Sequence, residues 1–187
     1  GDTEGIRTAL DPESPITLII HDDTKSKQFN PVEAQIASVL DKEIPDSEST
    51  GIVTPHNSQK GYLKAVNQDC TVDTVERFQG GQKDTMLISA TVSDPNYLSS
   101  ESEFIFDPRR LNVAISRMKK KLIVIAPRSL FDFIPDDVEL YEKSVIWAGL
   151  YDEVNGDDES AWSGTLSEFT GKELPHEATL DIYHGGA

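Results

Sequence analysis

The chain has little of what would build a disulfide-stapled, metal-bound or membrane-spanning protein. Its one cysteine, Cys70, rules out an internal disulfide and permits a reducing cytoplasm, so we expect a cytoplasmic protein. No cysteine or histidine lies near Cys70 at the spacing of metal ligands, so we predict no metal site and a structural thiol. No apolar run approaches the ~20 residues that a bilayer-spanning helix needs, so we expect no membrane partner.

Two signatures of a complete ATPase are also missing. Nowhere does the pattern Gly-x-x-x-x-Gly-Lys-Ser/Thr occur, so the chain has no loop to cradle the β- and γ-phosphates and no hydroxyl ligand for magnesium. No strand-like run ends in the Asp-Glu pair that such enzymes use on the metal. We therefore expect that the chain by itself does not turn over ATP.

Positive charge is scarce and unevenly placed. The chain holds 17 Lys and Arg against 33 Asp and Glu, and its net charge of −16 is unusual for a nucleic-acid-binding protein. Residues 132–187 hold 14 acids and 2 bases, whereas residues 108–131 hold seven Lys or Arg and no acid. We favour adaptation to a high-salt cytoplasm, where charges are screened over about 3 Å at 1 M salt. An acidic tail that serves a partner or inhibits the protein itself is the alternative.

Strand-like and helix-like segments alternate along most of the chain. The expected strands are 16–21, 51–54, 70–72, 85–92 and 121–126, and the expected helices are 31–40, 57–66 and the segment after Asp107. This alternation predicts an α/β fold with a parallel sheet and right-handed crossovers. We expect residues 1–14 to be a lead-in or linker, residues 15–133 to form the main domain, and residues 134–187 to be a partly ordered acidic extension.

The segment Asp107–Lys119 (DPRRLNVAISRMK) places positive charge on a predicted helix. Arg110 and Arg117 are seven residues apart, which puts them on nearly the same helix face. Asp107 is the expected N-cap and Pro108 the first helical residue, and the apolar stripe expected to dock on a sheet is Leu111, Ala114, Ile115 and Met118. Charge fixed in this way can stabilise the negative charge that develops in phosphoryl transfer. A solvated basic face on a surface helix is the alternative.

Three segments resemble motifs IV, V and VI of superfamily 1 helicases in their order and spacing. They are Gly51–Leu63, Val72–Asp84 and Asp107–Lys119. The likeness is greatest to the subgroup that holds the nonsense-mediated-decay helicase and the replication nuclease-helicase, and Ser26–Ala34 also resembles that subgroup. The resemblance implies a RecA-like three-layer α/β fold with a mostly parallel central sheet, the second of the two RecA-like domains of such a motor.

The resemblance implies catalytic roles for three basic residues. Arg117 corresponds to the arginine finger, which reaches across the ATP cleft to the γ-phosphate. Arg110 lies on the same helix, although bracing of that helix through a carboxylate is an alternative role for it. Lys60 stands where the family has a second arginine on the phosphates; lysine keeps the charge but lacks the bidentate fork. A solvated helix lysine is the alternative.

The resemblance also implies ligand contacts at the motif turns. We predict that the nucleotide is contacted by His56, Gln59, Gly80 and Gln82, and the nucleic-acid strand by Thr54, Thr74 and Gln79. In the family, the place of His56 often holds a tyrosine near the adenine, and the place of Gln82 an acid on the ribose. Ordinary roles as loop, turn and strand-end side chains are the alternatives.

These roles imply the C-terminal motor domain of an ATP-dependent DNA or RNA helicase. ATP and Mg would be bound mainly by a first, N-terminal RecA-like domain that this chain does not contain. The expected partners are that N-terminal domain and single-stranded DNA or RNA. The alternative function is a non-catalytic RecA-like module that docks a protein partner, which the departures at Lys60 and Gln82 favour.

Overall fold

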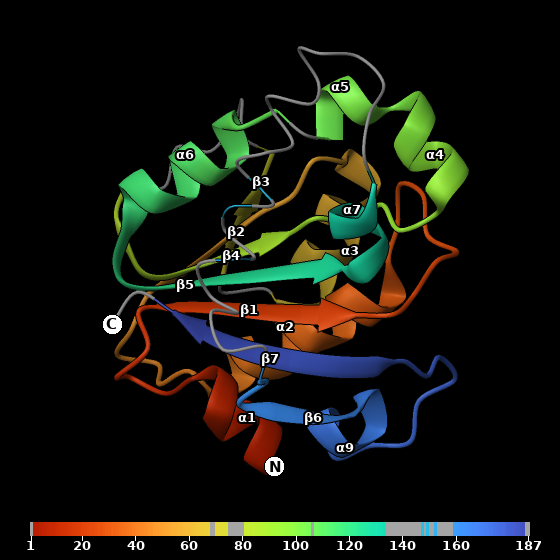
Figure 1. Cartoon of the computed structure of the whole chain (residues 1–187). Helices are drawn as coiled ribbons and strands as arrows, with labels where there is room; N and C mark the ends of the chain where they lie inside the picture. The colour runs from red at the N-terminus through yellow and green to blue at the C-terminus, as the bar shows by residue number, and fades with distance from the viewer. Residues whose placement is uncertain are drawn as a thin grey trace.

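A seven-stranded sheet forms the centre of the molecule (Figure 1). The computed structural model describes residues 2–67, 70–74, 81–105, 107–133, 147, 149, 152 and 159–185. In sheet order the strands are β3 (Thr71–Asp73), β2 (Thr50–Val53), β4 (Lys83–Ser89), β5 (Met118–Pro127), β1 (Ile16–His21), β7 (Thr179–Gly185) and β6 (Trp162–Thr165). The first five run parallel, whereas β7 is antiparallel to β1 and β6 is antiparallel to β7. The predicted mostly parallel α/β sheet is confirmed.

Helices cover both faces of the sheet and make the fold three-layered, as in RecA-like domains. One face carries α1 (Glu4–Ala9), α2 (Pro31–Glu43), α3 (Asn57–Val66) and α9 (Leu166–Thr170). The other face carries α4 (Pro95–Ser100), α5 (Ser102–Ile105), α6 (Arg109–Arg117) and α7 (Arg128–Asp132). Strand β1 shows how one strand serves both layers: Ile19 packs into the first core, and Leu18 and Ile20 pack into the second. Burial on both faces explains why the central strands read as continuous apolar runs.

Local helix signals were reliable where a polar side chain closes the first turn. The Asn30 side chain accepts a hydrogen bond from the Glu33 N–H at 3.0 Å, and Pro31 opens α2 as expected. The second predicted helix, expected to begin at Asn57 or Ser58, begins at Asn57, although its N-cap residue makes no side-chain hydrogen bond. Pro108 is the N-cap of α6 rather than its first residue, but the Asp107 carboxylate still accepts the Arg109 N–H at 3.0 Å.

The apolar stripe expected on α6 is narrower than predicted. Leu111 and Ala114 are buried against the sheet, but Ile115 is 52% exposed. The helix has nine residues and ends at Arg117, so Met118 already belongs to β5. Ile115 therefore lies at the edge of the buried stripe, because consecutive residues of a helix point in different directions and Ala114 faces the sheet.

The two ends of the chain join the fold more closely than expected. Residues 1–14 were expected to be a lead-in, yet Thr3 caps α1 and donates its hydroxyl to the Phe169 carbonyl at 2.6 Å. Strand β7 pairs with all of β1, so the sheet does not end at residue 133. Trp147 is buried in the second core.

Two short helices lie where the sequence suggested a long polar loop. Helices α4 and α5 occupy most of residues 93–106. The Asp94 side chain accepts the N–H groups of Asn96 and Tyr97, and Pro95 follows it. A cap followed by proline is a helix-start signal, but the first turn is polar and its apolar residues, such as Leu98, are too few to form a visible stripe.

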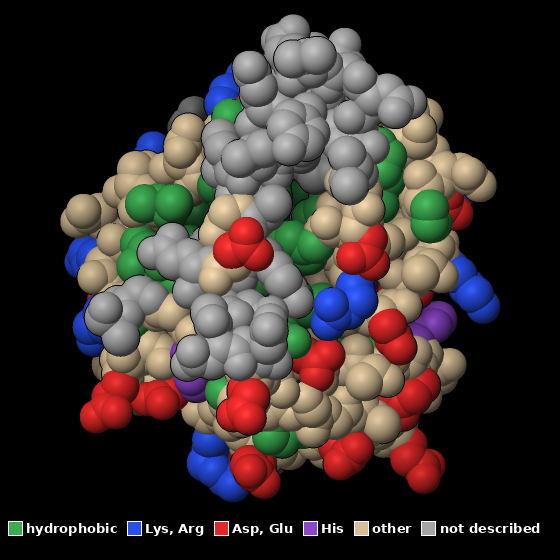
Figure 2. Space-filling view, in the orientation of Figure 1, with side chains coloured by type: hydrophobic (Ala, Val, Ile, Leu, Met, Phe, Trp, Pro, Cys, Tyr) green, Lys and Arg blue, Asp and Glu red, His purple; other side chains and the backbone are tan. Residues whose placement is uncertain are grey.

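The acidity predicts a fold that needs salt. Acidic side chains spread over the lower part of the face in Figure 2, around α1, β6 and α9. Repulsion among 16 excess negative charges should be screened as salt is added, so we expect the melting temperature to climb steeply toward molar salt. Changing the exposed residues Glu13, Asp46 and Glu173 to amides should make the slope shallower. A melting temperature of the unmodified chain that does not depend on the salt concentration would contradict salt adaptation.

Candidate functional site

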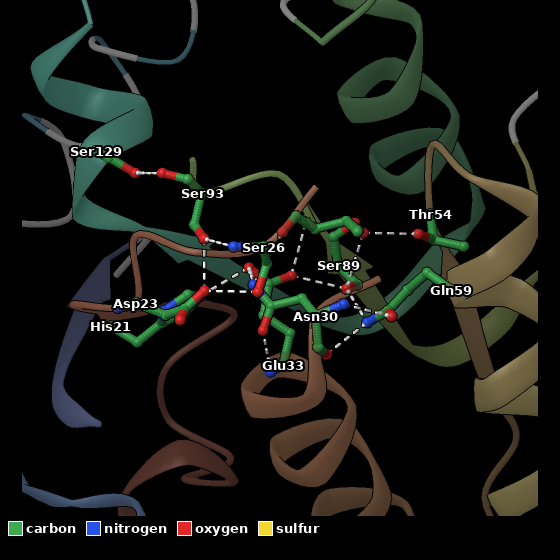
Figure 3. A network of polar contacts seen from close by, with 11 residues as sticks. His21, Asp23, Ser26, Asn30, Glu33, Thr54, Gln59, Ser89, Ser93 and Ser129 are labelled. Carbon is green, nitrogen blue, oxygen red and sulfur yellow. Dashed lines mark hydrogen bonds and ion pairs between the residues drawn. The ribbon is translucent and has the colours of Figure 1, made fainter. Parts of the chain in front are cut away.

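A buried polar cluster, drawn in Figure 3, lies at the carboxyl ends of four neighbouring parallel strands, β2, β4, β5 and β1. In open α/β sheets, ligands bind outside this end of the strands. We call the cluster the strand-end network. Its members come from β1, α2, β2, α3, β4 and α7 and the loops that follow the strands: His21, Asp23, Ser26, Asn30, Glu33, Thr54, Gln59, Ser89, Thr91, Ser93 and Ser129.

Glu33 is the centre of the strand-end network. Its side chain is fully buried, and Oε2 accepts His21 Nε2 at 2.7 Å. Its Oε1 accepts the Ser89 hydroxyl at 2.7 Å and the Thr91 N–H at 2.8 Å, and the Asn30 amide makes a longer contact to Oε2 at 3.5 Å. A buried carboxylate is tolerable only when its oxygens are satisfied in this way.

The hydrogen bonds of His21 fix its tautomer and exclude a hydrolytic triad here. Its Nδ1 accepts the Asp23 N–H at 3.3 Å, so Nε2 carries the proton and donates it to Glu33. Ser89 donates to Glu33 and not to the imidazole, so no histidine base activates its hydroxyl. The three residues therefore organise the strand ends rather than cleave a bond.

A second branch of the network surrounds Asp23. Its carboxylate accepts the hydroxyls of Ser26, at 2.6 Å, and of Ser93. Burial raises the pKa of Asp23, but the hydrogen bonds from the Ser26 and Ser93 hydroxyls outweigh it and hold the pKa below its ordinary value. Ser129 on α7 donates to the Ser93 carbonyl at 2.7 Å, so the branch ties β1 to the loop after β4 and to α7.

Gln59 fastens the first turn of α3 to the start of α2. It is fully buried; its Oε1 accepts the Asn30 N–H at 3.0 Å, and its Nε2 donates to the Asn30 carbonyl at 3.1 Å. The same Nε2 also reaches the Ser89 hydroxyl at 3.2 Å. These contacts occupy the amide within the chain, so the predicted contact of Gln59 with a nucleotide stays a prediction.

Asp73 gathers three of the predicted site residues. Its Oδ1 lies 3.0 Å from Lys60 Nζ and accepts the Thr74 N–H at 2.9 Å, and its carbonyl accepts the Thr54 N–H at 3.2 Å. Burial raises the pKa of Asp73, but the Lys60 ammonium and the Thr74 N–H together hold it below its ordinary value. The Thr54 hydroxyl is buried against the Thr91 hydroxyl at 3.0 Å. Lys60 is thus a paired lysine, not a fully solvated one.

His56 and Arg110 meet around one aromatic ring. The ring centroids of His56 and Phe104 are 5.4 Å apart, and the Arg110 guanidinium lies 5.0 Å from the Phe104 centroid. Arg110 is 4% exposed and donates to the carbonyls of Phe104 and Ile105, both at 3.0 Å. It therefore braces α6 against α5, through carbonyls instead of the carboxylate that we had considered. The His56 Nε2 atom is buried and has no hydrogen-bond partner.

Arg117 and Gln82 lie at the opposite, amino end of the strands. Arg117 is the half-buried last residue of α6, directly before β5, and Met118 pairs with Lys83 at the start of β4. Gln82, just before Lys83, is exposed. The fold thus separates these two from Lys60 and Thr74, which follow the carboxyl ends of β2 and β3. The predicted contacts of Gln79 and Gly80 lie outside the described residues.

Two surface cavities, of about 480 and 330 Å³, are not lined by any predicted site residue. Asp23 of the strand-end network lines the smaller one. Within the described ranges no group of three or more His, Cys, Asp or Glu could hold a metal ion, and no helix is long and apolar enough to cross a membrane. Burial, with the nearby Asp41 carboxylate, raises the pKa of the Cys70 thiol to about 12, as suits a structural residue.

The fold and the strand-end arrangement agree with what the chain matches among known proteins. The AAA domain family matches residues 18–129, which contain β2, β3, β4 and β5 and all but the first two residues of β1. That continuous match passes half of the sequence. The chain belongs to the AAA domain family.

The relatives that the chain resembles are named as helicases, so the chain is a helicase-type domain. The helicase/nuclease JHS1 of Arabidopsis thaliana, named for DNA replication, is 34% identical over 134 residues, 68% of this chain and 10% of that protein. The ATP-dependent helicase upf1 of Schizosaccharomyces pombe is 36% identical over 92 residues, 42% of this chain and 9% of that protein. The DNA polymerase alpha-associated DNA helicase A of Saccharomyces cerevisiae is 31% identical over 100 residues, 50% of this chain and 14% of that protein. The chain thus spans between 9% and 14% of the length of these relatives.

Apart from Thr54 and Gln59, the members of the strand-end network of this helicase-type domain were not among the predicted site residues. Its signals were present: polar residues follow directly on apolar strands, as His-Asp-Asp at 21–23 and as Ser-Ala-Thr-Val-Ser at 89–93. Because the carboxyl ends of parallel strands share one edge, two such runs are candidates to meet. Glu33 carried no signal of its own, because a glutamate in the first turn of a helix is ordinarily a solvated partner of the helix dipole.

The buried ring of His56 predicts a specific loss of stability in mild acid. Burial, assisted by the Arg110 charge, lowers its pKa from the ordinary 6.5 to about 4. In the unfolded chain the imidazole takes up a proton near pH 6.5, whereas in the folded domain it does so only near pH 4. The free energy of unfolding therefore has its full value above pH 6.5 and decreases as the pH falls from 6.5 to 4. The effect is at most about 3 kcal/mol, and smaller because the ring is partly exposed.

Urea unfolding at pH 7 and pH 4.5 measures this loss. His56→Gln should reduce the difference between the two free energies of unfolding, and His176→Gln, at an exposed histidine, should leave it unchanged. The depressed carboxyl groups of Asp23 and Asp73 titrate below their ordinary pKa of 3.8 and so fall outside this window. An unchanged pH dependence in His56→Gln would show that the ring is accessible to protons in the folded domain.

Proposed function

We propose that the chain is the C-terminal motor domain of an ATP-dependent superfamily 1 DNA or RNA helicase. It would contribute motifs IV, V and VI, with Arg117 as the arginine finger. Because Arg117 lies at the amino end of the strands and Lys60 beyond the carboxyl end of β2, α6 must shift toward α3 for both to reach one ATP. The observation that carries the proposal is that Gly51–Leu63, Val72–Asp84 and Asp107–Lys119 all fall within the one AAA domain match. Three relatives are named as helicases, two of them as ATP-dependent helicases.

The first turn of α3 is suited to a phosphate-bearing ligand. His56 is its N-cap but makes no side-chain capping bond, so no side chain of the cap satisfies the first N–H groups of this ten-residue helix. The helix dipole and the Lys60 ammonium add positive charge at the same point. The buried, unpartnered Nε2 of His56 is one further polar atom at this turn. These residues fit ATP, which when bound would supply the phosphoryl group; Mg would be held mainly by the N-terminal domain.

The nucleic-acid strand would run along the carboxyl ends of β2 and β3, beside Thr54 and Thr74. The Thr54 hydroxyl is engaged by Thr91, so it can reach a phosphate only if the loop at Thr91 moves with it. Hydrogen bonds from hydroxyls and backbone N–H groups to phosphates position a strand without reading its sequence. This placement suits a motor that steps along single-stranded DNA or RNA of any sequence.

Separating the two halves of the motor tests the proposal. The chain alone should hydrolyse no ATP above background, with or without single-stranded nucleic acid, because it has no phosphate loop. Adding the N-terminal RecA-like domain of the parent protein should restore hydrolysis that nucleic acid stimulates. Turnover by the isolated chain at an ordinary helicase rate would sink the proposal.

The ion pair between Lys60 and Asp73 favours an alternative function, a non-catalytic module that docks a protein partner. Asp73 already compensates the Lys60 charge at 3.0 Å, as suits a site that no longer handles phosphate. A parent protein whose two domains associate but never hydrolyse ATP would identify the chain as a non-catalytic docking module. Disruption of the ion pair by Asp73→Asn should then leave association unchanged.

A further inference from the structure

Thr91 adopts a backbone conformation that its side chain disfavours. Its φ is +76°, in the left-handed region, and it is the only such non-glycine residue among those described. A β-branched residue rarely takes this conformation unless the surroundings impose it. Thr91 lies just after β4 in the loop that leads to α4, so the surroundings of this loop hold it in a strained form.

Three hydrogen bonds from two other elements hold Thr91 in place. Its N–H donates to Glu33 Oε1 at 2.8 Å, and its carbonyl accepts the Asn30 side-chain amide at 2.9 Å. Its hydroxyl lies 3.0 Å from the hydroxyl of Thr54 at the end of β2. All four residues are buried, so water cannot replace a bond that is lost.

The residues that hold Thr91 also hold the first turn of α3. Asn30 bonds Gln59 through both its N–H and its carbonyl, and Ser89 bonds Gln59 and Glu33 together. Figure 3 shows these side chains converging from α2, α3 and the end of β4. A closed ring of buried hydrogen bonds of this kind has few alternative arrangements, because moving one member leaves the others unsatisfied.

We propose that Glu33 is a positioning residue that makes the loop at Thr91 and the first turn of α3 shift as one unit. The loop contacts Thr54, and the turn carries Lys60. Movement at the strand ends therefore reaches the uncapped end of α3 through Glu33, Asn30 and Gln59. The functional reading rests on the proposed function: nucleic acid at the strand ends and nucleotide at Lys60 would be coupled through this carboxylate.

Amide hydrogen exchange on this chain tests the mechanical link without reference to helicase activity. The reporters are the N–H groups of Thr91, Asn30 and Lys60, which donate to Glu33, Gln59 and the His56 carbonyl. In Glu33→Gln all three should exchange at least about tenfold faster, while amides within α6 keep their rates. Glu173→Gln, at an exposed glutamate, should change none of them. Faster exchange at Thr91 alone would overturn the proposal.

The imidazole of His21 gives a spectroscopic signature of the same change. In Glu33→Gln the neutral side-chain oxygen accepts Ser89 and Thr91 more weakly than the carboxylate does, and the amide nitrogen turns toward His21 Nε2. Two donors would then face each other, so the proton should move to Nδ1 and the Asp23 N–H should lose its acceptor. Nitrogen chemical shifts of His21 should report this tautomer change, and an unchanged Nε2–H tautomer would contradict the geometry.

Gln59→Leu breaks the connection between Glu33 and α3 at its α3 end. It provides a second test if the Glu33→Gln variant does not fold. It leaves every hydrogen bond of Glu33 intact but removes those of Asn30 to α3. The Asn30 and Lys60 amides should exchange faster, and the Thr91 amide should follow them if the unit is shared. A Thr91 amide that keeps its native rate in this variant would show that the loop and the turn are independent.

The parent protein then tests the functional consequence. The affinity for a single-stranded oligonucleotide is measured with and without a non-hydrolysable ATP analogue, and the ratio is expected to lie between about 5 and 150. Glu33→Gln should bring the ratio close to one while each ligand alone binds within about threefold of its native affinity. A native ratio in the variant would overturn the coupling. A wild-type protein that binds neither ligand would defeat the proposed function instead, and the exchange result would still decide the role of Glu33.

Discussion

Arg117→Ala in the parent protein is expected to lower kcat for ATP hydrolysis by about 10³–10⁵-fold and to change ATP affinity only slightly. An arginine finger acts on the charge that develops in the transition state, not on the ground-state nucleotide. The structure gives Arg117 a firm base: α6 is anchored by buried Leu111 and Ala114, and the next residue enters the central strand β5. Single-turnover hydrolysis and nucleotide binding, measured on the same preparation, separate the two effects.

Arg109 provides the matched control on the same helix. Its side chain is 65% exposed and lies 2.7 Å from the Asp107 carboxylate, so Arg109→Ala removes the same charge without touching the cleft. Its kcat should stay near the native value. Arg117→Lys should fall between the two, because lysine keeps the charge but not the bidentate fork. Equal losses in Arg109→Ala and Arg117→Ala would reduce the role of Arg117 to general charge on a basic helix.

The sequence predicted the parts of the fold whose signal is local. The parallel strands could be predicted because a strand buried on both faces appears as a short apolar run in the sequence. Helix α2 could be predicted because Asn30 is an N-cap residue directly before its first turn. Strands β6 and β7 were not predicted because their formation depends on contacts with residues far away in the sequence. Leu180 and Ile182 are buried only because β7 lies against β1, more than 150 residues earlier in the chain.

In the candidate site, too, local features could be predicted from the sequence and long-range contacts could not. Motif likeness singled out Lys60 and Arg117 from their neighbours in sequence, but it said nothing of which partners they meet. That Lys60 pairs with Asp73, and that Arg110 is buried on the α5 carbonyls, depends on loops that come together only in three dimensions. Thr91 is the extreme case, because three long-range hydrogen bonds impose its left-handed backbone and nothing in its own sequence favours it.

The Glu33 side chain should also be among the most sensitive positions for stability. Glu33→Leu is expected to lower the free energy of unfolding by about 3–5 kcal/mol, because it leaves His21, Ser89 and the Thr91 N–H buried without their acceptor. Such a loss is a large part of the 5–15 kcal/mol that holds a typical domain together. Urea unfolding monitored by circular dichroism measures it, with Glu173→Gln as a surface control.

A double-mutant cycle assigns part of that loss to the buried pair. His21→Leu alone should also destabilise the domain, because it removes one donor from a buried charge. The double variant should lose less than the sum of the two single losses, with a coupling energy of about 0.5–3 kcal/mol. It should not regain native stability, since Ser89 and Thr91 still lack an acceptor. A loss below about 1 kcal/mol in Glu33→Leu would mean that water reaches these groups, and that Glu33 is not what holds the strand ends together.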